Sequence, residues 1–176
     1  MHIFRYLGAT LLILVSSLAV AQQATNYVLA PGDRIAVSVF GQPDLSVEFT
    51  LSDNGVLNYP FLGEIRIAGL TMPELEQRIV EGLRGDYLIN PEVTVSMVEY
   101  RPFFLNGEIN RPGGYPYQPG LTLEKALALA GGLSPRAARN KIVVKRAGEL
   151  SGMEVNIKMS DPVQAGDVIT VPQSFF

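Results

Sequence analysis

GLTLEKALALAGGL, residues 120–133, carries the start, the body and the end of one short helix. Thr122 is a residue type that caps helix N-termini, and Gly131-Gly132 supply a stop. The apolar residues between them recur at the spacing of one buried helical face: Leu123, Ala126, Leu127 and Ala130. The stretch therefore predicts a helix that packs on a core, with no chemistry of its own.

A second stretch, GLTMPELEQRI at residues 69–79, repeats this helix start. Thr71 and Glu74 have the T-x-x-E spacing of a capping box, and Pro73 is harmless in the first helical turn. Gly85 is expected to end the helix. The apolar stripe between these signals consists of Leu75, Ile79 and Leu83.

The remaining regular structure is predicted to be strand. Ile35, Val37 and Val39 alternate with more polar neighbours, which is the period of a half-buried strand. Asp53-Asn54-Gly55 predicts a tight turn. Pro102 predicts that the start of its strand lies at an edge, since proline cannot donate to a neighbouring strand. The other predicted strands are residues 47–51, 56–59, 64–67, 93–98, 101–109, 142–144, 153–157 and 168–171.

Two helices isolated among strands predict an α+β fold. The best domain boundary falls at Tyr100-Arg101-Pro102, which divides the chain into residues 22–100 and 101–176. Ser134-Pro135 predicts a further cap with one helical turn.

Short motifs recur beside the two helices. Gly63-Glu64-Ile65 and Gly107-Glu108-Ile109 each precede a Gly-Leu-Thr helix start, and Gly32-Asp33 resembles Gly166-Asp167. These echoes predict two versions of one unit, in which a hairpin is followed by a helix and more strand, as in a β-grasp fold. The alternative is that good turn and cap residues recur by chance.

The N-terminus has the pattern of a secretory signal peptide. A short segment with one fixed charge, Arg5, precedes the apolar run 7–18, and Ala19-Val20-Ala21 is a small-x-small cleavage box. We expect cleavage after Ala21, which removes 21 of the 176 residues and leaves 155. The alternative, an uncleaved anchor, is disfavoured because a membrane-spanning helix needs about 20 apolar residues. Without cysteine, the chain has no site for a lipid-anchored lipoprotein.

Composition excludes several kinds of site. There is no cysteine, and the one histidine, His2, lies in the predicted signal peptide. A Ser-His-Asp triad, a Cys-His pair and a Cys/His zinc site are therefore excluded from the mature chain. Loss of Arg5 takes the formal net charge from −3 to −4, so nothing favours nucleic acid binding, which calls for clustered Lys and Arg. We expect no catalytic residues, no metal and no cofactor.

Motifs in order along the chain resemble the outer-membrane polysaccharide export family. Those of its export domain are YVLAPGD (residues 27–33), DNG (53–55), YPFLG (59–63), AGLT (68–71) and YLINP (87–91). Those of a soluble-ligand-binding β-grasp domain are GEI (107–109), PGGY (112–115), TL (122–123) and AGGL (130–133).

The resemblance implies a non-catalytic component that passes capsular or extracellular polysaccharide from the periplasm toward the outer membrane of a Gram-negative bacterium. It implies a ring of identical copies, an inner-membrane polysaccharide co-polymerase and a separate outer-membrane protein as partners. Full-length members carry a lipid-anchored cysteine, further grasp domains and a C-terminal amphipathic helix, and this sequence has none of these. We therefore expect a short periplasmic form. The alternative to a ring is a saccharide-binding module that acts on its own.

Two groups of residues are candidates for a site. Asn110, Arg111, Tyr115 and Tyr117 lie in one loop, where rings could stack on sugars and polar groups could bond hydroxyls. The alternative is a rigid turn fixed by glycine and proline, which explains nearly every residue there.

The second group is Asp33 and Asp167. They could act as paired carboxylates of a glycan-modifying enzyme, although turn caps at strand entrances are favoured. Phe175-Phe176 forms an apolar end that either packs on its own domain or contacts a partner.

Overall fold

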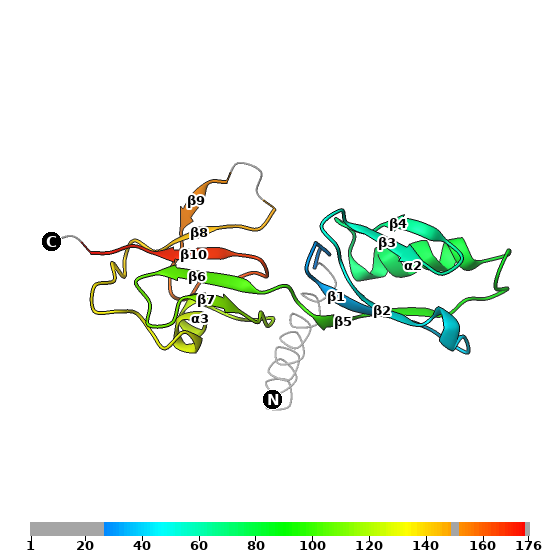
Figure 1. Cartoon of the computed structure of the whole chain (residues 1–176), viewed down its shortest axis with the longest axis horizontal. Coiled ribbons are helices and arrows are strands. Elements are labelled where there is room, and N and C mark those ends of the chain that lie inside the picture. Colours follow the sequence, from blue (N-terminus) through cyan, green and yellow to red (C-terminus); the bar gives the residue numbers. More distant parts are fainter. Residues whose placement is uncertain (1–26, 149–151, 175–176) are drawn as a thin grey trace, which may run out of the picture. The chain divides into compact units, whose positions relative to one another are not determined.

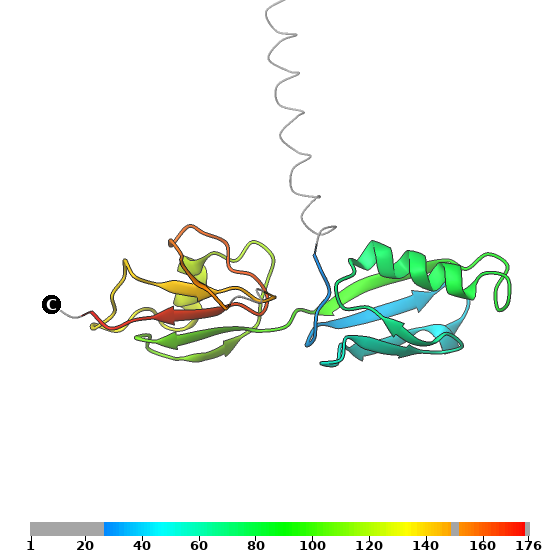
Figure 2. The same cartoon turned by 90° about the horizontal axis from the view of Figure 1, so that it is seen from above.

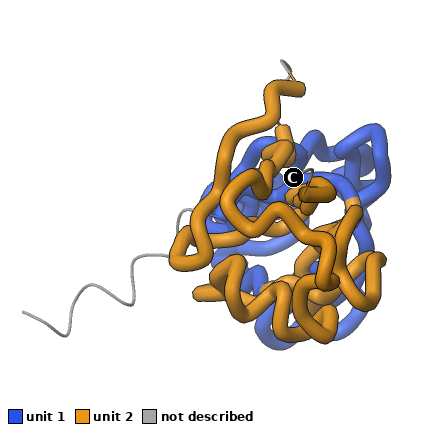
Figure 3. Tube along the Cα trace, turned by 90° about the vertical axis from the view of Figure 1, so that its left-hand side faces the viewer, with its two compact units in different colours: residues 1–31, 35–96 blue, residues 32–34, 97–176 orange. Residues whose placement is uncertain are grey.

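The computed structural model describes residues 27–148 and 152–174 (Figure 1). The predicted signal peptide, residues 149–151 and Phe175-Phe176 lie outside the described residues. The chain divides into two compact units (Figure 3). Of the described residues, unit 1 comprises residues 27–31 and 35–96, and unit 2 comprises residues 32–34, 97–148 and 152–174.

Unit 1 contains one main helix and two small sheets. A three-stranded sheet has the order β2-β1-β5, and β3 pairs with β4 in an antiparallel hairpin. Figure 2 shows α2 lying along the strands of this unit. The elements are β1 (Arg34–Val39), η1 (Pro43–Leu45), β2 (Val47–Thr50), β3 (Val56–Tyr59), β4 (Gly63–Arg66), α2 (Met72–Leu83) and β5 (Val93–Glu99).

The core of unit 1 follows the predicted periodicities. Ile35, Val37 and Val39 are buried on β1, and the predicted stripe of α2 is fully buried. Tyr59 is also buried, and its hydroxyl donates to the Leu45 carbonyl oxygen at 2.7 Å. A buried tyrosine hydroxyl needs such a partner, because an unpaired polar group in a core is costly.

Unit 2 has the β-grasp arrangement. Its five-stranded sheet has the order β7-β6-β10-β8-β9, in which only β6 and β10 are parallel. Helix α3 packs on one face of this sheet (Figure 1). The elements are β6 (Phe103–Gly107), β7 (Gly113–Tyr115), α3 (Leu123–Leu129), β8 (Val143–Lys145), β9 (Glu154–Asn156) and β10 (Val168–Val171). The predicted α+β class is confirmed.

The prediction that the strand after Pro102 starts at an edge of the sheet is wrong. Strand β6 lies inside the sheet, between β7 and β10. Pro102 itself precedes the strand, and its carbonyl oxygen accepts from the Gly166 amide at 3.1 Å, so its missing N–H interrupts no ladder. At the other end of β6, Gly107 has φ +87°, and a Cβ there would lie 2.1 Å from the Val171 carbonyl oxygen. Only glycine fits that position.

Both helices begin as predicted but are capped differently. Thr71 and Glu74 form the full capping box of α2. Thr122 accepts from the Lys125 amide at 3.5 Å, with no reciprocal bond. The predicted helical turn after Ser134 is instead a turn in which the Ala137 amide donates to the Ser134 carbonyl oxygen. No helix within residues 27–148 and 152–174 is long and apolar enough to cross a membrane.

Of the repeated motifs, Gly-Leu-Thr occupies corresponding positions in the two units and Gly-Glu-Ile does not. Gly69 and Gly120 both have positive φ and lead into a threonine cap, so the two helix starts share this glycine and threonine although their capping bonds differ. By contrast, Gly63 opens β4, whereas Gly107 ends β6. The Gly-Glu-Ile repeat is therefore a recurrence of turn residues, and the two units differ in sheet topology.

Candidate functional site

The loop that begins at Asn110 is bonded to the C-terminal end of α3. The backbone amides of Asn110 and Arg111 donate to the carbonyl oxygens of Gly132 and Ala130, at 3.1 and 3.0 Å. Asn110 Nδ2 donates to the Gly131 carbonyl oxygen at 2.6 Å, and Arg111 Nη2 donates to that of Leu129 at 2.8 Å. The Leu129 and Ala130 carbonyls belong to the end of α3, which leaves its last carbonyls without helical partners, and those of Gly131 and Gly132 follow it. The Arg111 side chain therefore caps the helix, and that of Asn110 holds the turn just after it.

The two tyrosines of the loop are half-buried against unit 2. The Tyr115 hydroxyl donates to the Arg111 carbonyl oxygen at 2.6 Å, and its ring lies 6.0 Å from that of Phe103. The rings of Tyr117 and Tyr100 meet edge to face at 5.3 Å. Burial raises the pKa of the Tyr117 hydroxyl, with smaller contributions from Tyr100 and Asp167.

All four predicted residues lie within residues 110–117, with Tyr115 at the end of β7 and the other three in the flanking loops. The bonds described for their side chains go to backbone carbonyls of the same unit, and both rings pack on its core. These contacts are those of the rigid turn. Asn110 and Arg111 are nevertheless exposed, so sugar binding by this loop stays a prediction.

The two aspartates of the Gly-Asp echo are completely buried, and each forms an ion pair with an arginine. Arg101 Nη1 lies 2.9 Å from Asp33 Oδ2, and the Arg101 amide donates to Asp33 Oδ1. Arg146 Nη1 lies 2.6 Å from Asp167 Oδ2, which also accepts from the Gln164 amide at 2.8 Å. Asp167 thus accepts from an amide of its own turn, as a turn cap does, whereas the bonds described for Asp33 join its strand entrance to the distant Arg101.

Burial raises the pKa of Asp167, although the Gln164 amide and Arg146 oppose the rise. The two arginines were not predicted from the sequence. Their positions, 68 residues from Asp33 and 21 from Asp167, follow from the fold, and no local pattern signals them. Among residues 27–148 and 152–174, no group of three or more His, Asp or Glu is placed to hold a metal ion.

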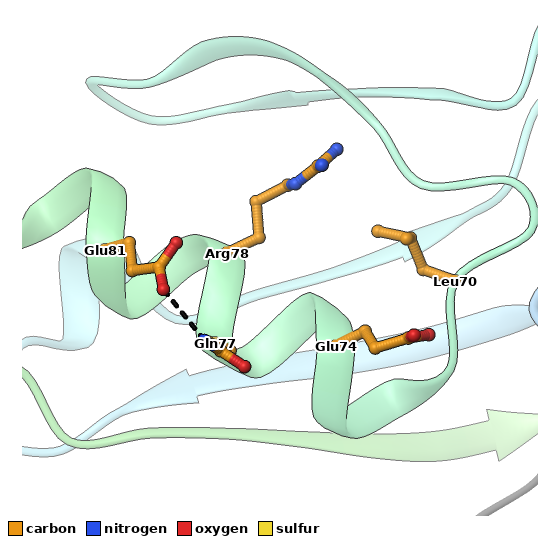
Figure 4. A pocket seen from close by; sticks show the side chains of 5 residues that line it. All are labelled: Leu70, Glu74, Gln77, Arg78 and Glu81. Carbon is orange, nitrogen blue, oxygen red and sulfur yellow. Dashed lines mark hydrogen bonds between the residues drawn. The ribbon is translucent and has the colours of Figure 1, made fainter.

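Unit 1 carries two shallow depressions along α2. One, of about 240 Å³, is lined by Leu70, Glu74, Gln77, Arg78 and Glu81 (Figure 4). The other, of about 320 Å³, lies between α2 and β4 and is lined by Leu62, Glu64, Ile65, Arg66, Arg78 and Gly82. Both are lined by Arg78, whose guanidinium reaches away from the helix and donates to the Arg66 carbonyl oxygen at 3.2 Å. Arg78 is the one lining residue that they share, and the two depressions together are here called the α2 groove.

An exposed aromatic pair lies next to the α2 groove. The Phe61 and Tyr87 rings are 5.1 Å apart and inclined by 37°. Phe61 precedes the groove residue Leu62, and Tyr87 follows the end of α2. In the sequence both residues stand out only as parts of family motifs, YPFLG and YLINP, and no local pattern marks them as a site.

Comparison with known proteins identifies both halves of the chain. Residues 21–98 match the family described as polysaccharide biosynthesis/export protein, and residues 102–157 match the SLBB domain. The chain belongs to the polysaccharide export family. The predicted family, and the predicted order of its two domains, are confirmed.

Three curated relatives have names that agree with this family. The exopolysaccharide production protein ExoF of Rhizobium meliloti is 39% identical over 93 residues, covering 51% of this chain and 22% of the relative. The EPS I polysaccharide export outer membrane protein EpsA of Ralstonia nicotianae is 26% identical, covering 86% and 48%. The polysialic acid transport protein KpsD of Escherichia coli is 29% identical, covering 69% and 22%. The chain thus spans half or less of each relative's length.

Proposed function

We propose that this protein is a periplasmic component of a machine that exports capsular or extracellular polysaccharide. The observation that carries the proposal is the export domain followed by the SLBB domain across most of the chain. The names of the relatives support the same role. The signal peptide pattern, with cleavage after Ala21, supports export to the periplasm, with the outer membrane as its destination.

The proposed role is non-catalytic. Asp33 and Asp167 are the two candidates for catalytic carboxylates that act on a glycan. Each is buried and forms an ion pair with an arginine. An acid–base pair for glycoside hydrolysis has to reach the scissile bond from both sides. Two fully buried carboxylates that hold strand entrances in place are poorly suited to that task.

The chain is proposed to work as a homo-oligomeric ring between an inner-membrane polysaccharide co-polymerase and a separate outer-membrane protein. Light scattering on the purified mature protein tests the ring. A particle several times the monomer mass supports it. A monomer that binds polymer would favour the alternative, a saccharide-binding module that acts alone.

A deletion strain of the source organism tests the function itself. Loss of extracellular polysaccharide, restored by the chain supplied in trans, is the expected result. Export that continues at the normal level without the chain would refute the proposal.

The loop beginning at Asn110 requires its own test. Arg111→Ala combined with Tyr115→Phe removes the guanidinium and one hydroxyl while the rings stay in place. If the loop binds sugar, export and polymer binding fall. If it is only a rigid turn, both remain and only the stability of the protein falls.

A further inference from the structure

The turn that joins β3 to β4 has an unusual residue at its third position. The Leu62 amide donates to the Tyr59 carbonyl oxygen at 3.2 Å, Pro60 occupies the second position, and Phe61 has φ +64°. Proline followed by a residue with positive φ is the type II arrangement, whose third position favours glycine. An L-residue with a Cβ pays a conformational cost there, and a bulky aromatic residue is a clear outlier.

Elsewhere in the described residues, positions with positive φ are occupied by glycine, which avoids this conformational cost. Among the described residues, fourteen others have positive φ, and all are glycine. Within residues 27–148 and 152–174, Phe61 is therefore the one place where a strained backbone is combined with a large side chain. Strain of this kind persists where the surrounding structure fixes it, and it gathers at binding sites.

The strain is not explained by burial of the ring. Phe61 is 64% exposed and Tyr87 is 47% exposed. The turn is attached to α2 by the next residue, Leu62, which packs so closely that a Cβ at Gly82 would lie 2.8 Å from Leu62 Cδ1. Phe61 has Tyr87 as its ring partner, and the Tyr87 hydroxyl donates to the Phe61 carbonyl oxygen at 3.2 Å. The fold thus fixes the orientation of Phe61 but leaves its ring uncovered.

The surroundings of the pair combine apolar and polar groups. The α2 groove continues from Leu62 along β4 and α2, and most residues that line it are polar or charged. Polysaccharides present both apolar ring faces and many hydroxyl groups, so an aromatic surface beside a polar groove matches their chemistry. A docked protein would instead need a largely apolar, desolvated centre, which this groove lacks.

We propose that Phe61 and Tyr87 form a saccharide-binding platform, on which one sugar ring of the exported polymer stacks while its neighbours lie in the α2 groove. Arg78, at the shared wall of the groove, is placed to donate to hydroxyl or carboxylate oxygens. This inference deepens the proposed function and rests on it.

The test uses polysaccharide purified from cultures of the source organism and cut into short oligomers. Phe61→Gly gives the type II turn its preferred residue and removes the ring. We expect the variant to have a higher melting temperature than the wild type and to bind the oligomers about tenfold more weakly in calorimetry. Tyr87→Ala should weaken binding similarly. Phe40→Ala, which removes another highly exposed ring of unit 1, is the matched control and should leave binding unchanged.

A fluorescent reporter locates the contact directly. The chain has no tryptophan, so Phe61→Trp places a single tryptophan at the platform. Its emission should shift on addition of the oligomers, and that of Phe40→Trp should not.

Three results would overturn the inference. One is equal binding by the wild type and Phe61→Gly. Another is a lower melting temperature of Phe61→Gly, which would make the ring part of the fold. A third is normal binding by Phe61→Gly with failed complementation of the deletion strain, which would assign the pair to a protein partner. If the deletion strain exports normally while Phe61-dependent binding persists, the site stands and the proposed function fails.

Discussion

At the scale of single residues, two arginines of unit 2 form ion pairs of very different burial. Arg101 pairs with the fully buried Asp33, and its own side chain is only 18% exposed. Arg34 pairs with Glu99 at 3.3 Å, with side chains 43% and 62% exposed. Water screens the second pair but not the first.

Arg101→Met should therefore be strongly destabilising. It leaves the buried carboxylate of Asp33 without its cation, which costs about 3 kcal/mol of unfolding free energy. Chemical denaturation followed by circular dichroism measures the loss. The double variant Asp33→Asn with Arg101→Met, which removes both charges, should lose less than the single variant.

Arg34→Met is the matched control. An exposed pair contributes at most about 1 kcal/mol, so this variant should stay within that range. Equal losses in the two arginine variants would show that burial does not determine the strength of these pairs.

Tyr59 gives unit 1 a pH dependence in the alkaline range. Burial raises the pKa of its hydroxyl from 10.0 to about 12. Because the pKa is higher in the folded state, the stabilisation is fully present below pH 10 and is lost as the pH rises toward 12. The shift corresponds to about 2 to 3 kcal/mol.

Unfolding free energies of the wild type and Tyr59→Phe, measured from pH 9 to pH 12, test this dependence. The variant should be less stable at pH 9, because the Leu45 carbonyl oxygen loses its donor. It should then lose less stability than the wild type as the pH rises. Parallel curves would contradict the assignment.

At the scale of elements, the two helix starts differ in what satisfies their first amides. In α2, Thr71 and Glu74 bond each other across the first turn, and this bonding lowers the pKa of Glu74. In α3, the amides of Leu123 and Glu124 donate instead to backbone carbonyls of Asp161 and Met159, each at 3.0 Å. Helix α3 is therefore capped largely by the chain that crosses its end.

Thr71→Ala should consequently cost more stability than Thr122→Ala. The first removes half of a reciprocal box and should cost about 1 to 1.5 kcal/mol, while the second should cost about 0.5 kcal/mol. Thermal unfolding of both variants, compared at one pH near neutrality, gives the two values. The reverse order would show that the crossing segment contributes little to α3.

These elements also show what the sequence could predict. Some features depend only on neighbours within a few residues, so they could be predicted from sequence patterns. These are the helix starts, the buried stripe of α2 and the alternation of β1. The position of β6 in its sheet depends on β10, more than sixty residues away, so Pro102 was misleading. The same holds for the site. The loop at Asn110 was found from its composition, but the arginines of the buried acids and the Phe61–Tyr87 pair arise only when distant segments meet.

At the scale of the whole molecule, each unit has its own buried core. Leu75, Ile79 and Leu83 of α2 are buried in unit 1, while Leu123 and Leu127 of α3 belong to the core of unit 2. Units with separate cores can open separately, because the loss of packing in one does not remove contacts in the other. Ile79 and Leu127 therefore offer a matched pair of core positions, one in each unit.

Ile79→Ala should destabilise unit 1 selectively. Truncation of a fully buried isoleucine costs about 3 kcal/mol, through lost transfer energy and the cavity left behind. Hydrogen exchange followed by mass spectrometry should show faster exchange in peptides from α2, β1 and β5, with little change in β6 and β10. Leu127→Ala should give the opposite pattern. Faster exchange throughout the chain in both variants would mean instead that the two cores unfold as one cooperative body.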